Sequence, residues 1–590
     1  MHLAPLDWMI VAAAFAVYLA VGLWASRTAG GGYDAYFLGG RGQPWWILGT
    51  SMVATTFATD TPNLVAGIVR EYGVFGNWLW WAFLLSGSVT TFFFARLWRR
   101  SGVRTDVEFY ELRYSGRAAA WLRGFRAAYL GILFNVLIMA NVTLAAIKIG
   151  GILLGLSPLA TVATAAGITL VYSMVGGLTG VLLTDLVQFA VAMVGSVAAA
   201  AWLVGLPEVG GLAALVAHPA VVPRLALLPD PATVPFDALL TAFLLPLGVQ
   251  WWSAYYPGSE PGGGGYVVQR ILAARDERHA AGATLLFNVM HYAVRPWPWI
   301  LVGLASLVVF PSVESLRQAY PDLDPQFVQH DMAYPAMLAR LPAGVLGLVV
   351  ASLIAAYMST ISTQMNWGSS IVVNDLYVRF LDPHASPARQ VLVGRLATAA
   401  LLAMGCGLAL RMRDALSTFQ LVMQVGAGTG LIFMARWFWW RVNAAAEIAA
   451  MVVSFALAAT FFAWHQADPA AVPPVWQQML VGVAGTTAAW VAVTLLTPPT
   501  DANILATFVA RVRPGGPGWG PVTKRLAAAA DGDLWTALVA TIASTIATWA
   551  ALFAMGLAVY GRGVEALVAA AVAATGGLVV RACWSRLSFH

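Results

Sequence analysis

The stretch that decides the fold is residues 346–377, LGLVVASLIAAYMSTISTQMNWGSSIVVNDLY. Its apolar part is long enough to cross a bilayer, for which about 20 apolar residues suffice. Its middle carries four hydroxyl side chains, those of Ser359, Thr360, Ser362 and Thr363. Because lipid offers no hydrogen-bond partners, these hydroxyls must face protein, water or an ion.

One face of this predicted helix offers oxygen atoms to a cation. Ala356, Ser359 and Thr360 have the i, i+3, i+4 spacing of one helix face. A backbone carbonyl and two hydroxyls there are neutral ligands that suit a small hard cation. The alternative is structural, because such hydroxyls also bond to carbonyls one turn earlier and let helices pack closely.

The composition indicates a polytopic membrane protein. The chain has 590 residues, 60% hydrophobic and 10% charged, and its mean hydropathy is +0.74. These values exclude a soluble enzyme. The net charge of +6 does not indicate nucleic-acid binding, because the basic residues lie in short loops between apolar segments. Cys406 and Cys583 imply neither a disulfide framework nor a metal cluster, and no catalytic triad, zinc spacing or nucleotide motif is present.

Apolar segments predict about fifteen membrane-spanning helices. They lie at residues 6–26, 43–69, 73–98, 125–152, 157–175, 178–205, 236–256, 282–310, 342–377, 391–411, 415–437, 443–465, 476–497, 534–559 and 563–583. Arginines, among them Arg270 and Arg436, collect in alternate loops, so the positive-inside rule places the N-terminus outside and the C-terminus inside. We therefore expect a multi-pass protein of the cell (cytoplasmic) membrane, of bacterial origin.

Two predicted spans are interrupted at mid-membrane depth. Residues 55–63, TTFATDTPN, interrupt the second span, and Pro246 and Gly248 interrupt the seventh. Irregular backbone at that depth is tolerated only where it lines a cavity. The two interruptions are five spans apart, which inverts the second copy, and inverted repeats with broken helices indicate a transporter binding site. The alternative is two unrelated proline kinks.

This pattern divides the chain into four parts. An extra N-terminal helix and loop cover residues 1–42, a first inverted repeat covers 43–206, and a second covers 207–440. Four additional helices follow in 441–590, with a cytoplasmic linker at 498–533.

Two further stretches receive structural interpretations. Residues 257–265, PGSEPGGGG, lack the lysine of a phosphate-binding loop and are expected to form a flexible insertion. Residues 436–441, RWFWWR, lie at a predicted cytoplasmic span end, where we expect an interfacial belt anchored by arginine.

The chain resembles the sodium:solute symporter family, which includes sodium-coupled sugar, proline and pantothenate carriers. The resemblance rests on YFLGGRGQPWWILGTSMVAT, TDVEFYELRY, YSMVGGLTGVLLTDLVQ, YVVQRILAAR and the stretch quoted first. It implies an all-α, leucine-transporter-like (LeuT-like) fold of inverted five-helix repeats, with sodium as coupling ion and no other cofactor. Carried over by motif, the sodium ligands are the carbonyls of Ala54, Phe57 and Ala356 and the hydroxyls of Ser359 and Thr360.

A second sodium site is a further expectation. Ser359, Ser362 and Thr363 repeat the i, i+3, i+4 spacing, and Asp185 could supply a negative charge or mark the exit. A carboxylate inside a span is a functional candidate by default. The alternative is a protonated or hydrogen-bonded structural aspartate.

The resemblance also places the solute beside the sodium site. The candidates for solute contact are Thr56, Asp60, Thr61, Gln250, Trp251, His291 and Gln424. Gln424 matches a glutamine that the sugar carriers place against their substrate. The stretch NWLWWAFLLSGS, residues 77–88, lacks the carboxylate that those carriers use, which argues against a hexose. Structural alternatives are a core tryptophan, a buried histidine and an ion pair between Asp60 and Arg295.

The expected function is sodium-coupled import of a small polar or charged organic solute by alternating access. The expected partners are this solute, sodium and the bilayer, without nucleic acid, and no enzyme activity is expected. The alternatives are a proton-coupled carrier of the same fold, in which Asp60 or Asp185 titrates, and a solute sensor. The sequence leaves the solute, the sodium stoichiometry and the oligomeric state open.

Overall fold

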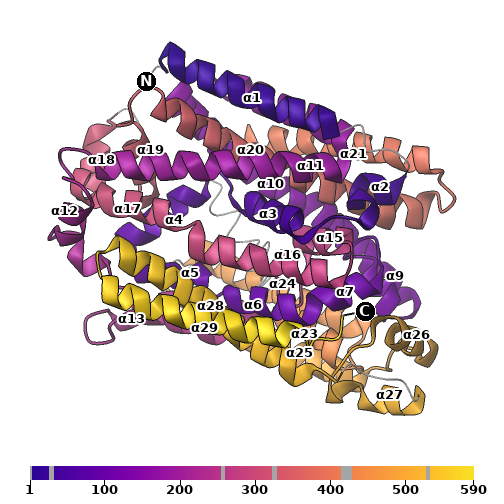
Figure 1. Cartoon of the computed structure of the whole chain (residues 1–590). Coiled ribbons are helices and arrows are strands. Elements are labelled where there is room, and N and C mark those ends of the chain that lie inside the picture. Colours follow the sequence, from indigo (N-terminus) through magenta and orange to yellow (C-terminus); the bar gives the residue numbers. More distant parts are fainter. Residues whose placement is uncertain are drawn as a thin grey trace.

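The computed structural model describes residues 3–25, 32–253, 260–321, 328–412, 428–468, 470–526 and 532–589. Within these ranges the chain folds into helices and forms no β-strand beyond one isolated bridge between Gln43 and Ala274. Figure 1 shows α1 (Pro5–Ala25), α11 (Pro158–Val204), α20 (Val345–Ile371) and α21 (Pro387–Ala409) together on one side of the molecule, and the yellow helices α28 (Leu534–Val559) and α29 (Gly563–Trp584) on the opposite side.

Eleven helices of the described residues are long and apolar enough to cross a membrane. Besides the six just named, two are single helices, α24 (Ala444–Ala467) and α25 (Val475–Leu496). The other three are spans made of consecutive helical segments. They cover Val74–Ser101, α9 (Gly116–Ala128) with α10 (Asn135–Ile149), and α16 (Glu277–Asn288) with α17 (Trp297–Val309). Four predicted spans fall short of this criterion: the two expected to be interrupted, the fifth, and the eleventh, which lies largely outside the described residues. The total of about fifteen and the four-part division stay predictions.

The predicted break in the second span is confirmed. Helix α3 (Trp45–Thr56) stops at mid-span, and α4 (Thr61–Tyr72) begins after a gap of four residues. Pro62 explains where α4 starts, because proline lacks a backbone N–H and is accommodated best in the first turn of a helix.

The predicted break at Pro246 is wrong. A helix begins with α13 (Phe236–Leu239) and continues through Pro246 and Gly248 to Ser253 at the end of α14 (Trp251–Ser253). Its backbone is π-helical over Leu240–Leu244 and Pro246–Gln250. These wider turns let the helix continue although Pro246 has no backbone N–H to donate. The next helix, α15 (Gly265–Ala273), begins after the irregular residues 260–264.

The described part of the glycine-rich stretch is not a flexible insertion. Glu260 and Gly262 are buried, and the Trp98 indole donates to the Gly262 carbonyl over 2.9 Å. Gly262 has φ of +80°, and a β-carbon there would lie 2.4 Å from the Phe433 carbonyl oxygen. Glycine is therefore needed for close packing at this position.

The predicted interfacial belt at residues 436–441 is also wrong for its first residues. Arg436, on α23 (Gly430–Phe438), is 4% exposed and pairs with Glu447 over 3.4 Å. Its guanidinium lies 4.7 Å from the ring centre of Phe109, and Trp437 is fully buried. A carboxylate on α24 draws this arginine into the core, where it is paired.

A carboxylate on α1 caps the N-terminus of α20. Asp7 is buried, and its Oδ1 accepts hydrogen bonds from the backbone N–H groups of Gly344, over 2.6 Å, and Gly347, over 2.8 Å. The first N–H groups of a helix have no partner within it, and its positive dipole end favours an anion. A β-carbon on Gly347 would lie 2.5 Å from the Asp7 α-carbon, so glycine permits this approach.

We predict that Asp7→Ala lowers the free energy of unfolding by about 1–2 kcal/mol, because the half-buried N–H of Gly344 and the buried N–H of Gly347 lose their acceptor. Asp7→Asn keeps one amide oxygen and should lose less. Thermal unfolding of both variants in detergent measures the difference. Unchanged stability of Asp7→Ala would contradict the capping role.

Candidate functional site

The break after α3 leaves its last carbonyl groups facing α20. A helix ends with carbonyls that have no partner within it, and its C-terminal end carries a partial negative charge. The Thr360 hydroxyl on α20 lies 3.0 Å from the Thr55 carbonyl oxygen and 3.1 Å from that of Ala356. One turn further along α20, the Thr363 hydroxyl lies 2.9 Å from the Thr55 hydroxyl. The hydroxyl run of α20 therefore meets the broken end of α3.

The predicted sodium ligands lie on these two elements. Ala356, Ser359 and Thr360 are buried on α20, and Ala54 and Phe57 are buried at the end of α3. The Phe57 N–H donates to the Ala54 carbonyl over 3.1 Å. Carbonyls at a negative helix end together with hydroxyls can bind a small hard cation. The assignment of these five groups as ligands stays a prediction.

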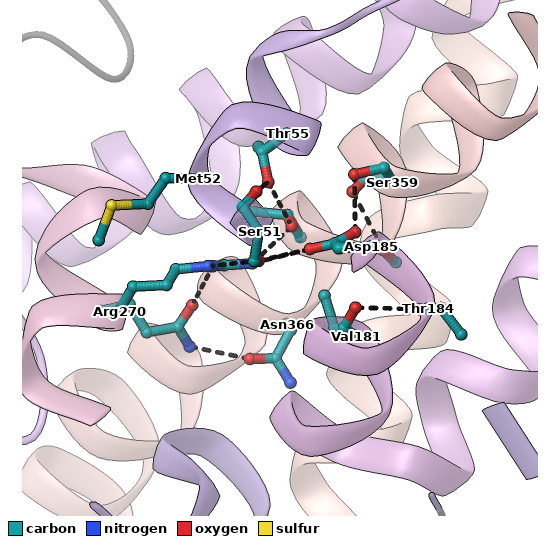
Figure 2. A network of polar contacts seen from close by, with 12 residues as sticks. Ser51, Met52, Thr55, Val181, Thr184, Asp185, Arg270, Ser359 and Asn366 are labelled. Carbon is teal, nitrogen blue, oxygen red and sulfur yellow. Dashed lines mark hydrogen bonds and ion pairs between the residues drawn. The ribbon is translucent and has the colours of Figure 1, made fainter. Parts of the chain in front are cut away.

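Asp185, on α11, joins both elements (Figure 2). It is fully buried, and its carboxylate accepts hydrogen bonds from the Ser51 hydroxyl of α3, over 2.5 Å, and the Ser359 hydroxyl of α20, over 2.7 Å. A hydroxyl that donates its proton keeps its oxygen lone pairs. Ser359 can therefore donate to Asp185 and coordinate a cation through the same oxygen.

Arg270 is a further residue of this site, although the charge pattern of the sequence predicts a loop arginine there. Arg270 lies on α15, is fully buried, and points its guanidinium at Asp185, with 3.8 Å between Nη2 and Oδ2 (Figure 2). Nη2 also donates to the Thr363 hydroxyl over 2.6 Å, and Nε donates to the Ser51 hydroxyl over 3.3 Å. The available signal was its place in the apolar run YVVQRILAA, which predicts a helix buried on all sides.

Gln269 fixes the guanidinium from the other side. Its Oε1 accepts from Arg270 Nη1 over 2.9 Å, while its Nε2 donates to Asn366 Oδ1 over 2.8 Å. Ser362, another residue predicted for a second sodium, instead donates to the Ser359 carbonyl over 3.0 Å. Of that predicted set, Asp185 and Thr363 contact Arg270, and the second sodium stays a prediction.

On the other side of the break, Thr56 meets two residues of the α16–α17 span. Its hydroxyl lies 2.9 Å from His291 Nδ1, and Arg295 Nη1 donates to it over 2.9 Å. His291 packs edge-on against Trp80, with 5.6 Å between ring centres, and the Arg295 guanidinium lies 5.1 Å from the centre of the Trp299 ring. The structure thus brings two predicted solute contacts together with Arg295.

The other predicted solute contacts are more scattered. Thr61 donates weakly to the Thr56 carbonyl over 3.5 Å, and Asp60 is exposed within the break. Gln250 donates to the Leu79 carbonyl over 3.1 Å, and the Trp251 indole donates to the Leu247 carbonyl over 3.0 Å. Gln424 lies outside the described residues. Among the ion pairs of the described residues, none joins Asp60 to Arg295, so the structural alternative for that pair is not found.

The sequence model of the sodium:solute symporter family matches residues 36–454 of this chain. A sodium/glucose cotransporter of Vibrio parahaemolyticus is 26% identical over 485 residues, which cover 77% of this chain and 85% of that protein. Sodium/glucose cotransporter 2 of Rattus norvegicus is 27% identical, with 66% of this chain and 61% of the relative covered. Sodium/myo-inositol cotransporter 2 of Mus musculus is 28% identical, with coverage of 68% and 60%. The chain thus spans about three fifths of these two mammalian relatives.

A solved structure of a Na+-coupled sialic acid symporter, in a substrate-bound outward-open state, has a similar fold. The TM-score is 0.66 at 19% sequence identity, and the match covers 84% of this chain and 99% of the other. The likeness supports the predicted LeuT-like arrangement of helices.

We predict that Thr56→Val lowers the free energy of unfolding by about 1.5–3 kcal/mol, because the buried Arg295 guanidinium loses a half-buried hydroxyl acceptor. Thr164→Val is the matched control, since the Thr164 hydroxyl is exposed and donates to the carbonyl one turn earlier, that of Ala160. Thermal unfolding of both variants measures the difference. Equal, small effects would contradict a contribution of the Thr56–Arg295 contact.

Proposed function

The chain belongs to the sodium:solute symporter family, and on that premise we propose that it imports a small polar or charged organic solute with sodium by alternating access. Its relatives are sodium-coupled cotransporters, not enzymes, which supports sodium as the coupling ion and a multi-pass place in a membrane. The proposed orientation has the N-terminus outside and the C-terminus inside. An inward potential of 100 mV then contributes about 2.3 kcal/mol per charge moved.

The observation that carries this proposal is the meeting of α3 and α20 at a helix break. Sodium entering there would replace the Thr360–Thr55 contact with ion coordination, through the five oxygens predicted above. The negative end of α3 favours the positive charge, and the Ser359 hydroxyl, which donates its proton to Asp185, would offer its oxygen lone pairs to the ion. Sodium would in this way hold α3 against α20 and fix the position of the break.

The solute would bind on the opposite side of the same break. Thr55 contacts α20 and the adjacent Thr56 contacts His291 and Arg295, so one peptide links the two sites. Ordering of this peptide by sodium would complete the solute site, which is a direct physical route to coupling. A guanidinium beside the break favours solutes with carboxylate or other acceptor groups. Trp80 and Trp81, where sugar carriers have a carboxylate, favour such solutes over hexoses.

We predict that sodium, but not potassium at equal ionic strength, raises the thermal unfolding midpoint of the purified protein, and that Thr360→Ala removes this effect. A ligand at a hundredfold excess over its dissociation constant stabilises by about 2.7 kcal/mol. Thr398→Ala on α21 is the matched control, because the buried Thr398 hydroxyl contacts the Gly394 carbonyl of its own helix.

Equal stability of the wild type in both cations would overturn the sodium-site assignment. A response to pH in place of sodium would favour the proton-coupled carrier of the same fold. Solute binding with no uptake into proteoliposomes under a sodium gradient would favour the sensor.

We predict that Arg295→Gln weakens binding of the transported solute by about tenfold or more, because a charge-assisted contact is lost, while sodium alone still stabilises the protein. Thermal shift with a panel of amino acids, organic acids and sugars, each with sodium, identifies the solute and measures the loss. Arg562→Gln is the control, since Arg562 is exposed and pairs with Glu565 over 2.9 Å. Wild-type affinity in Arg295→Gln would contradict the placement of the solute.

A further inference from the structure

The Arg270–Asp185 pair lies at the junction of two groups of helices. The start of α3 and the end of α15 are tied by two main-chain hydrogen bonds, from Gln43 N–H to the Ala273 carbonyl and from Arg275 N–H to the Gln43 carbonyl, each 3.1 Å long. Asp185 and Thr363 belong to α11 and α20, which pack along each other (Figure 1). Displacement of α3 would therefore carry α15 and its arginine with it.

Three polar contacts near this junction meet at one carboxylate. Ser51 and Arg270 reach Asp185 from α3 and α15, and Ser359 reaches it from α20 (Figure 2). Both members of the ion pair have fully buried side chains. A buried carboxylate without a nearby cation is strongly destabilised, so Asp185 must gain another cation or a proton whenever Arg270 moves away.

The proposed sodium site lies next to that carboxylate, because the two share Ser359. Ser359 is a predicted sodium ligand and already donates its proton to Asp185 over 2.7 Å. A sodium ion that leaves the site past Ser359 would meet the Asp185 carboxylate directly. While Arg270 holds its place, the guanidinium supplies the cation there, and a second positive charge beside it would be repelled.

We propose that the Arg270 guanidinium and a transported sodium ion use the Asp185 carboxylate in alternation. Arginine holds the carboxylate while α3 and α15 are closed onto α11 and α20, and sodium takes it when α15 withdraws. This inference rests on the proposed sodium-coupled function. In this scheme Arg270 is a positioning residue. Its guanidinium keeps sodium away from Asp185 until this side of the molecule opens. It pairs with Asp185 again once sodium has left.

The test is a sodium titration of thermal stability at constant ionic strength, with potassium as the replacement ion, on the full-length purified protein. The variants are Arg270→Gln, Arg270→Lys, Asp185→Asn and the double variant Asp185→Asn/Arg270→Gln. Arg123→Gln is the matched control, because Arg123 is also a buried arginine and pairs with Asp375 over 2.6 Å. The readout is the sodium concentration that gives half of the stabilisation.

In Arg270→Gln, we expect sodium to replace the missing cation, so that the half-effect concentration falls about tenfold or more below the wild-type value. Arg270→Lys keeps a positive charge and should stay within about twofold of wild type, and Arg123→Gln should do the same despite lower stability. The double variant should not show this fall in half-effect concentration, because no carboxylate charge remains to attract the ion.

An unchanged half-effect concentration in Arg270→Gln overturns the alternation while leaving sodium coupling intact. Absence of any sodium response in the wild type overturns both. If Arg270→Gln unfolds in potassium, rescue by sodium supports the proposal. Failure of sodium to rescue it, while the double variant folds, overturns the proposal. Rescue in potassium by low pH alone also overturns it, because a proton then satisfies Asp185.

Discussion

A helix that stops inside a membrane must find partners for its last carbonyl groups, because lipid supplies none. In this protein the constraint acts at Thr56, where α3 ends, and α20 meets it with a run of hydroxyls. Hydroxyls suit this task because they can donate to a carbonyl in one state and coordinate a cation in another. The break, the hydroxyls of α20 and the carboxylate of Asp185 are therefore parts of one arrangement.

Part of this arrangement could be predicted from the sequence, because it depends on residues that are neighbours along the chain. The interruption at residues 55–63 was visible because Pro62 favours the first turn of a new helix, and small hydroxyl residues in an apolar run predicted the face of α20 that meets the end of α3. The supposed break at Pro246 failed because π-helical turns absorb a proline without ending the helix, and nothing local distinguishes the two outcomes.

The burial of charged side chains is a second feature that local sequence patterns could not predict. Arg270 and Arg436 look like loop arginines when counted along the chain, yet each meets a carboxylate on another helix. Arg270 finds Asp185 on α11 and Thr363 on α20, both more than 80 residues away in sequence. Such pairing depends on which helices become neighbours, which hydrophobic periodicity alone does not specify.

The cap that Asp7 provides has a consequence for how the chain is made. The carboxylate is synthesised 337 residues before Gly344, whose N–H it accepts. At a translation rate of about 5–20 residues per second, α1 waits about 15–70 s before its partner emerges from the ribosome. During that interval α1 must stay close to the place where α20 will insert, so the biogenesis of α20 depends on the position of α1 in the bilayer.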